Sequence, residues 1–254
     1  MRVLLTGAGG QLGTDLRRAV PAFSGIDLVG RTRAELDVTD ADSVRAEVAA
    51  VGPDVIIHAG AWTAVDACES DPDRAERVNG RGTANVVAAA RAVGARVVYV
   101  STDYVFDGSK PDPYVEEDQP NPASVYGRSK LLGEQSVGTD DVIVRTSWVC
   151  GAHGANMVKT ILRLAESHDT LTFVDDQIGK PSFTVDLAAT LLKLVAVDVT
   201  GVLHVTNEGV VSWYEFCREV LMAAGMDPDR VRPCATSELD PPRPAPRPAN
   251  SVLA

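Results

Sequence analysis

Tyr126 and Lys130 are the residues whose types and spacing most directly suggest chemistry. Gly127, Arg128 and Ser129 separate them in a segment that the sequence pattern predicts to be helical over residues 126–135. Side chains four residues apart lie on the same face of a helix. A phenol there can donate a proton, and a neighbouring ammonium group would make it more acidic. The pair is weak evidence alone, because short spacings of this kind also arise by chance.

The energetics of such a pair restrict where it can work. Tyrosine titrates near pH 10 in water, so an acid near neutrality needs a pKa lowered by roughly two to three units, about 3–4 kcal/mol. An exposed contact between Lys130 and Tyr126 supplies only about 0.2–1 kcal/mol. We therefore expect Lys130 to act in a site drier than the surface, assisted by a cationic nicotinamide ring. The pair thus predicts a dinucleotide cofactor bound beside it.

Ser101, Thr102 and Asp103 follow a predicted strand at residues 96–100. Ligands of open α/β sheets bind outside the carboxyl ends of the strands, so a hydroxyl at this position would point toward a ligand crevice. The same residue types also cap helices and turns, and the segment alone is explained equally well in that way. Its combination with Tyr126 and Lys130 favours a catalytic hydroxyl.

Alternating apolar strands and helices make up the first 150 residues. Strands are predicted at residues 3–5, 26–29, 54–58, 96–100 and 141–145, and helices at residues 11–20, 41–51, 79–93 and 126–135. Continuous apolar strands separated by helices are typical of a parallel sheet covered on both faces. The sequence therefore predicts an α/β fold, with a Rossmann-type doubly wound parallel sheet as a dinucleotide-binding domain over residues 1–150.

The pattern weakens after Gly151. Helices are predicted at residues 157–166, 185–195 and 214–224, and short strands at residues 172–174 and 202–205. Residues 240–250 are rich in proline, which indicates an extended segment. We expect residues 151–254 to form mainly a small α/β substrate-binding lobe, with later segments returning to the large domain.

Composition excludes several classes of function. A formal net charge of −11 disfavours nucleic acid and anionic membranes as partners, because both require clustered Lys and Arg. The four cysteines contain no Cys-x-x-Cys pair, so neither a zinc site nor a disulfide framework is indicated, and we expect no metal. The sequence shows no signal peptide, and its longest apolar helical stretch, residues 187–197, is too short to span a bilayer. These features predict a cytoplasmic protein.

A glycine-rich turn follows the first strand. Gly7, Gly10 and Gly13 are spaced three residues apart, whereas the usual dinucleotide fingerprint would place glycine where Leu12 stands. The three roles survive this change: one glycine permits a tight turn, one lets the backbone approach a pyrophosphate, and one lets the helix pack closely. Free N–H groups at the helix start would face the phosphates. A turn with no ligand is the alternative interpretation.

The end of the second strand bears on the choice of cofactor. An acidic residue usually holds the ribose hydroxyls of NAD there, whereas arginine accommodates the extra phosphate of NADP. Asp27 lies too early in the strand, and Arg31 and Arg33 follow it. We therefore expect NADP(H) to be preferred and NAD(H) to be possible, although a solvated basic turn is the alternative. Asp37 and Val38 could lie against the adenine.

These motifs together resemble the extended short-chain dehydrogenase/reductase superfamily and, within it, the dTDP-4-dehydrorhamnose reductase family. The matching segments run nearly end to end: residues 4–13, 63–69, 101–108, 126–130, 145–149, 176–182 and 247–251. The most specific is Ser-Thr-Asp-Tyr-Val-Phe-Asp-Gly, from Ser101 to Gly108. The resemblance implies NAD(P)H-dependent reduction of the C4 ketone of dTDP-4-dehydro-L-rhamnose to dTDP-L-rhamnose.

The resemblance also implies roles for individual residues. Thr102 would hydrogen-bond the substrate carbonyl, Tyr126 would donate the proton, and Lys130 would hold the nicotinamide ribose and acidify Tyr126. The cofactor would be bound by Gly7, Gly10, Gln11, Leu12, Gly13, Arg31, Arg33, Asp37, Val38, Ala61, Trp62, Thr63, Val100, Tyr126 and Lys130. The substrate would be bound by Thr102, Asp103, Trp148 and Asn156, with Lys159 and Arg163 as further candidates. Trp148 could instead be a core aromatic, and Asn156, Lys159 and Arg163 could equally lie on a solvated helix face.

The chain departs from the family pattern in several places. Cys150 stands where an aromatic residue is common, Trp62 stands where tyrosine or histidine is frequent, and the C-terminus is shorter than we expect. The resemblance leaves a homodimer open, and no acidic cluster predicts a metal at its interface. Two other functions remain: a ketoreductase for another NDP-4-keto-6-deoxysugar, and a non-catalytic subunit resembling the β subunit of methionine adenosyltransferase. The intact Thr102, Tyr126 and Lys130 argue against the second.

Overall fold

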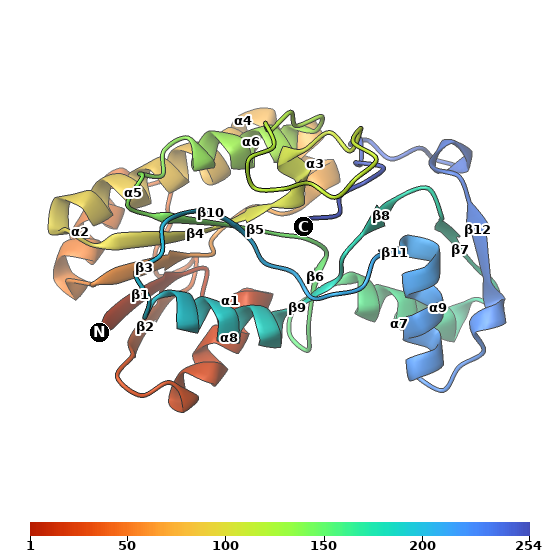
Figure 1. Ribbon diagram of the computed structural model, residues 1–254, viewed down its shortest axis with the longest axis horizontal. Helices are drawn as coiled ribbons and strands as arrows, with labels where there is room; N and C mark the ends of the chain where they lie inside the picture. The colour runs from red at the N-terminus through yellow and green to blue at the C-terminus, as the bar shows by residue number, and fades with distance from the viewer.

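The large lobe is built around a six-stranded parallel sheet, shown in Figure 1. The computed structural model describes all residues from Met1 to Ala254. The strands lie in the order β10-β5-β4-β3-β1-β2. Their bounds are β1 (Arg2–Thr6), β2 (Asp27–Arg31), β3 (Val55–His58), β4 (Arg96–Thr102), β5 (Val142–Thr146) and β10 (Gly201–His204). The predicted doubly wound α/β fold is confirmed.

Helices cover both faces of this sheet, as continuous apolar strands require. On one face lie α1 (Gln11–Ala19) and α8 (Thr184–Leu194). On the other lie α2 (Ala41–Val51), α5 (Gly82–Val93) and α6 (Val125–Glu134). Neighbouring residues of β1 show the division, because Leu5 belongs to the apolar core on the α1 side and Leu4 to the core on the α2 side.

The chain reverses its direction of winding at β1, which lies between β2 and β3. The connection after β1 runs through α1 on one face, and the connection after β2 runs through α2 on the other. Such a switch point leaves a crevice outside the carboxyl ends of the strands, where open α/β sheets bind ligands.

Short helical segments follow β3 and β4 near this crevice. They are α3 (Val65–Ser70), α4 (Pro72–Ala75), the π-helical turn η2 (Glu76–Arg81) and the 3-10 turn η3 (Asp103–Val105). The predicted helix over residues 79–93 is thus split, because its first turn is π-helical and continues from α4. The remaining 3-10 turns are η1 (Val20–Ala22), η4 (Pro228–Arg230) and η5 (Thr236–Glu238).

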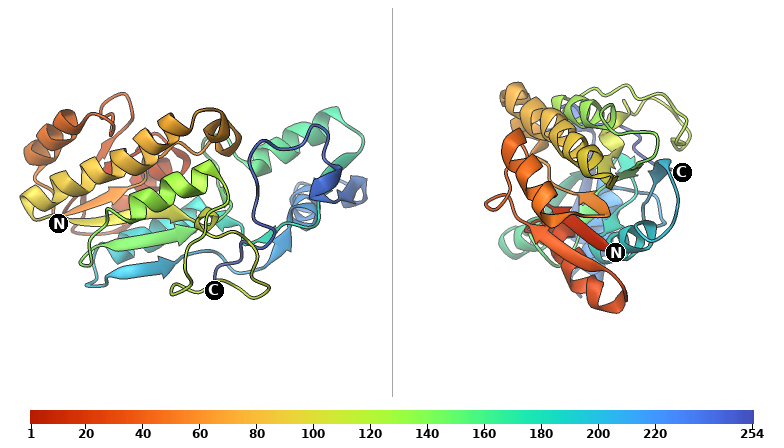
Figure 2. Two further views of the ribbon diagram at one scale, coloured as in Figure 1. Left: turned by 90° about the horizontal axis from the view of Figure 1, so that it is seen from above. Right: turned by 90° about the vertical axis from the view of Figure 1, so that its left-hand side faces the viewer.

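A small lobe lies at one end of the molecule (Figure 2). Its helices α7 (Met157–Ser167) and α9 (Trp213–Ala223) pack around Ile161, Phe216 and Leu221. Three two-stranded pairs complete it: β7 (Leu171–Val174) with β12 (Val231–Cys234), β8 (Ile178–Gly179) with β11 (Val211–Ser212), and β6 (Val149–Cys150) with β9 (Ser182–Phe183). Between these segments the chain returns to the large lobe through α8 and β10.

Candidate active site and cofactor cavity

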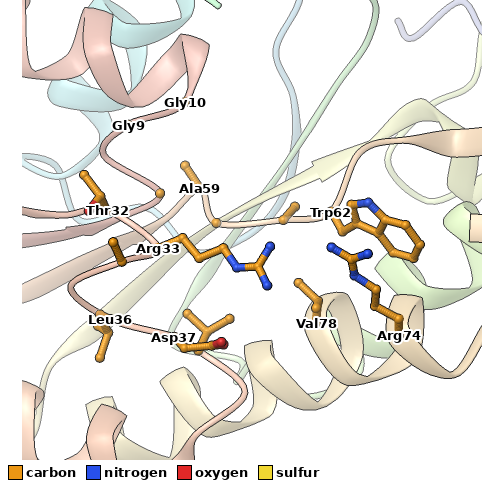
Figure 3. A pocket seen from close by; sticks show the side chains of 15 residues that line it. Gly9, Gly10, Thr32, Arg33, Leu36, Asp37, Ala59, Trp62, Arg74 and Val78 are labelled. Carbon is orange, nitrogen blue, oxygen red and sulfur yellow. The ribbon is translucent and has the colours of Figure 1, made fainter. Parts of the chain in front are cut away.

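A cavity of about 420 Å³ opens at the switch point of the sheet. Its volume lies in the range of small-molecule sites. Predicted cofactor residues among its lining are Gly7, Gly10, Arg33, Asp37, Val38, Ala61 and Trp62. Residues that the sequence did not single out also line it: Gly9, Thr32, Ala34, Leu36, Ala59, Gly60, Arg74 and Val78. Figure 3 shows these side chains around the cavity.

The glycine turn has the geometry that a bound pyrophosphate requires. Gly7 has φ +75°, and a Cβ there would lie 2.8 Å from the backbone nitrogen of Gly60. A Cβ on Gly13 would collide with the Gly7 carbonyl oxygen, so this glycine sets the approach of α1 to the turn. Gly10 caps α1 without any side-chain hydrogen bond, which leaves the first N–H groups of the helix free for phosphate. The turn therefore fits the dinucleotide.

The two arginines predicted for the cofactor differ in the structure. Arg33 extends along the cavity, as Figure 3 shows. It makes no ion pair. Arg31 does not line it, because its guanidinium group pairs with Glu47 at 2.7 Å. The Asp37 carboxylate accepts hydrogen bonds from the N–H and hydroxyl groups of Thr39, which lower its pKa. Arg33 is thus the cationic group that this strand end offers to a ligand.

Asn156, which the sequence predicts to contact substrate, forms hydrogen bonds within the protein. Its side-chain nitrogen donates to Gln11 Oε1 at 3.0 Å and to the Gly151 carbonyl oxygen at 2.7 Å. Its side-chain oxygen caps α7 by accepting from the Lys159 N–H at 3.1 Å. Gln11 does not line the cavity itself. Asn156 therefore joins the first turn of α1 to the first turn of α7 across the two lobes.

Helix α6 carries Tyr126 and Lys130 to the carboxyl end of β4. Ser124 caps the helix by accepting a hydrogen bond from the Gly127 N–H at 3.0 Å. Gly127 is required for close packing, since a Cβ there would collide with the Tyr104 carbonyl oxygen. The Tyr126 ring is buried, and it packs edge-on against Tyr104 at a centroid distance of 5.6 Å. The tyrosine is thus fixed beside the turn that follows β4.

Burial raises the pKa of Tyr126 far above its ordinary value of 10, and the Thr102 hydroxyl opposes this shift. Without cofactor, desolvation outweighs the neighbouring groups and the phenol is not acidified. The expected acidification applies to the site with a nicotinamide bound and stays a prediction. The raised pKa keeps the phenol protonated at neutral pH, which is the form that can donate a proton.

Lys130 occupies a dry environment, as its proposed role requires. Its Nζ donates to the Val100 carbonyl oxygen at 2.8 Å and lies 4.1 Å from the centre of the Tyr99 ring. Its side chain is buried. This burial lowers the pKa of Lys130 from 10.5 to about 7, although the charge of Glu134 acts in the opposite direction.

A buried ion pair holds α6 against the sheet. Glu134 accepts two hydrogen bonds from the guanidinium group of Arg145, at 2.8 and 3.1 Å, and one from the Ser101 hydroxyl at 2.5 Å. Both charged side chains are at most 5% exposed. Because Glu134 lies one turn after Lys130, the same carboxylate anchors the helix and favours the ammonium form of the lysine.

Thr102 and Asp103 lie together at the end of β4. The Thr102 hydroxyl donates to Asp103 Oδ1 at 2.9 Å, and both residues are buried. Burial raises the pKa of Asp103 to about 7, with nearby hydroxyl groups opposing it. Thr102 also caps the η3 turn, accepting from the Tyr104 N–H at 3.2 Å. The alternative capping role of Thr102 is therefore present, and its role as a catalytic hydroxyl stays a prediction.

Asn79 connects the cofactor cavity to α6 and was missed by the sequence analysis. Its side chain accepts from the Trp62 N–H at 2.7 Å and donates to the Trp62 carbonyl oxygen at 3.0 Å. It also donates to Ser129 Oγ at 2.9 Å, and Ser129 in turn donates to the Tyr126 carbonyl oxygen at 2.7 Å. The only sequence signal for this role is an asparagine at the start of a predicted apolar helix, over residues 79–93.

A second cavity, of about 620 Å³, lies in the small lobe. Its lining includes Tyr104, Phe173, Trp213, Arg243 and Arg247. Tyr104 brings it to the turn after β4, where Tyr126 also packs. Thr102, Tyr126 and Lys130 do not line this cavity, which reaches them only through Tyr104.

The other substrate candidates do not line this second cavity. Trp148 stacks on Trp213 with ring centroids 3.6 Å apart, so it backs a lining residue instead of forming the wall. Lys159 donates to the Gly154 carbonyl oxygen, and Arg163 is exposed. Of the remaining cofactor candidates, Thr63 is exposed outside the first cavity and Leu12 lies in the core between α1 and α8.

Comparisons with known proteins agree with this geometry. A family model described as "RmlD substrate binding domain" matches residues 1–254. The dTDP-4-dehydrorhamnose reductase of Mycolicibacterium smegmatis is 42% identical over 99% of this chain and 77% of its own length. The chain belongs to the dTDP-4-dehydrorhamnose reductase family.

Two other proteins similar to this chain are informative, one for its bound cofactor and one for the substrate in its name. A crystal structure of dTDP-4-dehydrorhamnose reductase from Bacillus anthracis in complex with NADP has a TM-score of 0.94 and 39% identity, covering 100% of this chain and 90% of that one. A dTDP-4-keto-6-deoxy-D-glucose reductase of Streptomyces niveus is 41% identical over 94% of this chain and 84% of its own length.

No group of three His, Cys, Asp or Glu side chains is arranged to hold a metal ion. None of the helices has the length and apolar character needed to cross a bilayer.

Proposed function

We propose that this protein is an NADPH-dependent reductase of dTDP-4-dehydro-L-rhamnose that forms dTDP-L-rhamnose. The observation that carries the proposal is the family match over the whole chain. It is supported by the carboxyl end of β4, where the Thr102 hydroxyl lies beside Tyr126 and Lys130 donates to the Val100 carbonyl oxygen. When bound, the reduced nicotinamide would supply a hydride to the ketone carbon of the sugar. The protein must then supply a proton to the ketone oxygen.

Tyr126 is the proposed proton donor. Its phenol is protonated at neutral pH, since burial raises its pKa. The Thr102 hydroxyl would hydrogen-bond the same oxygen and hold it in reach of the phenol. Lys130 would stabilise the phenolate that remains, because an ammonium group acts strongly on a neighbouring anion in a dry site.

The second cavity is the proposed site of the nucleoside diphosphate part of the substrate. Arg243 and Arg247 line it, and both pair with Asp66, at 3.7 and 2.9 Å. Guanidinium groups suit a diphosphate, and the aromatic side chains of Phe173 and Trp213 offer faces for the base. Tyr104, which touches both this cavity and Tyr126, would place the sugar near the phenol.

The experiment that tests the proposal is a panel assay of NADPH oxidation against several NDP-4-keto-6-deoxysugars. Turnover of dTDP-4-dehydro-L-rhamnose at the highest kcat/KM supports the proposal. The similarity to the Streptomyces niveus enzyme favours one alternative, reduction of another dTDP-4-keto-6-deoxysugar, and preferential turnover of such a sugar would favour it. Tight NADPH binding without turnover of any sugar in the panel would instead indicate the non-catalytic subunit.

A further inference from the structure

Arg74 lines the cofactor cavity, although no motif of the sequence pointed to it. Its guanidinium group lies over the Trp62 ring, 4.2 Å from the ring centre. Arg74 makes no ion pair with any acidic side chain of the protein, whereas Arg31 at the end of β2 pairs with Glu47. Figure 3 shows Arg74 and Arg33 extending from different elements toward the same part of the cavity.

The position of Arg74 is determined by the local fold. The Asp71 side chain caps α4 and accepts from the Arg74 N–H at 3.0 Å, and Pro72 occupies the first turn. The guanidinium group stacks on the Trp62 ring, and the Asn79 side chain holds the Trp62 backbone through two hydrogen bonds. The arginine is therefore oriented by a stacking contact, which restricts its side chain before any ligand binds.

Two guanidinium groups without an ion pair, those of Arg33 and Arg74, face one cavity in a chain of net charge −11. The only acidic residue of the lining, Asp37, directs one carboxylate oxygen to the N–H and hydroxyl of Thr39. Two like charges that face one cavity repel each other, and a dianion between them removes that repulsion. A phosphate monoester carries about −1.5 to −2 charges at pH 7 and offers three acceptor oxygens.

We propose that Arg74 and Arg33 together bind the 2′-phosphate of NADPH, so that Arg74 is a second determinant of cofactor specificity. Arg33 follows β2, where the adenosine ribose of a dinucleotide is recognised. The pyrophosphate has a separate site, because the free N–H groups at the start of α1 face it. The inference rests on the proposed use of NADPH and names a specificity residue for it.

The test measures ligand affinity by calorimetry, without any reaction. Adenosine 2′,5′-bisphosphate carries the 2′-phosphate, and adenosine 5′-monophosphate is the matched probe that lacks it. Arg74→Met keeps an apolar stem against Trp62 and removes the charge. Arg77→Met is the control variant, because Arg77 is exposed three residues later, lies outside the cavity and changes the net charge equally.

We expect Arg74→Met to weaken binding of the bisphosphate about tenfold, which corresponds to about 1.4 kcal/mol, and binding of the monophosphate less than twofold. Arg77→Met should change neither by more than twofold. Combining Arg74→Met with Arg33→Met should remove the preference for the bisphosphate. Arg74→Lys, which keeps a charge and serves if the methionine variant misfolds, should lose less than Arg74→Met.

Two results would overturn the inference. If Arg74→Met weakens both probes equally, Arg74 serves the pyrophosphate or merely supports Trp62. If it weakens neither, the arginine only stacks on the indole. Because neither probe contains a nicotinamide or a sugar, these outcomes are independent of the reaction. A protein that reduces no keto sugar but binds the bisphosphate through Arg74 would refute the proposed reaction alone.

Discussion

The buried ammonium group of Lys130 makes folding stability depend on pH. Its pKa falls from 10.5 to about 7 in the folded protein because of burial. Between these two values the unfolded chain binds a proton that the folded chain has released, so stability rises with pH through this window. The cost of burying the charge is fully present below about pH 7 and disappears as pH approaches 10.5.

The expected magnitude follows from the width of the window that can be measured. One pKa unit corresponds to 1.36 kcal/mol, so about 2.5 units between pH 7 and pH 9.5 correspond to about 3 kcal/mol. Lys130→Met removes the titrating group and keeps a flexible side chain of similar length. The free energy of unfolding of the unmodified protein, minus that of Lys130→Met, should therefore rise by about 3 kcal/mol over this range.

Urea unfolding of both proteins at several pH values measures this difference. Other titrating groups contribute to both proteins and largely cancel in the subtraction. A difference that stays constant from pH 7 to pH 9.5 would refute the reasoning, since Lys130 would then keep an ordinary pKa in the folded protein. The dry site required for its action on Tyr126 would not exist.

Two further predictions concern α6. Glu134→Gln should destabilise the protein by about 3–5 kcal/mol, because it leaves the buried guanidinium group of Arg145 without its carboxylate. Urea unfolding at pH 7 measures this change, and a loss of stability below 1 kcal/mol would contradict the prediction. Gly127→Ala should lower kcat at least tenfold, because the added Cβ meets the Tyr104 carbonyl oxygen and displaces Tyr126. Steady-state kinetics test the second prediction, with Gly138→Ala in the loop before β5 as a control expected to keep its kcat.

The sheet could be predicted from the sequence because its strands are buried on both faces. Residues 54–58 and 96–100 read as continuous apolar runs, which only a covered parallel sheet accommodates. The resulting strands differ from the predicted bounds by one or two residues. The π-helical turn was not predictable, because the sequence pattern of Glu76–Arg81 is that of an ordinary helix.

The sequence could supply candidate site residues where a residue type carries its own chemistry. Tyr126, Lys130 and Thr102 could be chosen in this way, and Gly7 and Gly10 by the turn they form. Residues that act through tertiary contacts could not be identified, because their partners are distant in sequence.

Three cases show the limit. Arg31 and Arg33 look equivalent in sequence, and only the position of Glu47 on α2 separates them. Asn156 is a polar residue at a helix start, and nothing in the sequence indicates its contact with Gln11, 145 residues away. Arg74 lies in an acidic helical segment whose pattern gives no hint of the cavity that it faces.

The proton donor is the central claim, and the kcat of Tyr126→Phe with dTDP-4-dehydro-L-rhamnose tests it most directly. The phenylalanine ring preserves the packing against Tyr104 and removes only the hydroxyl. We expect kcat to fall by about 10²–10⁴, the range of general acid catalysis, while the Kd for NADPH changes less than threefold. A variant that keeps more than a tenth of the original kcat would show that another group delivers the proton.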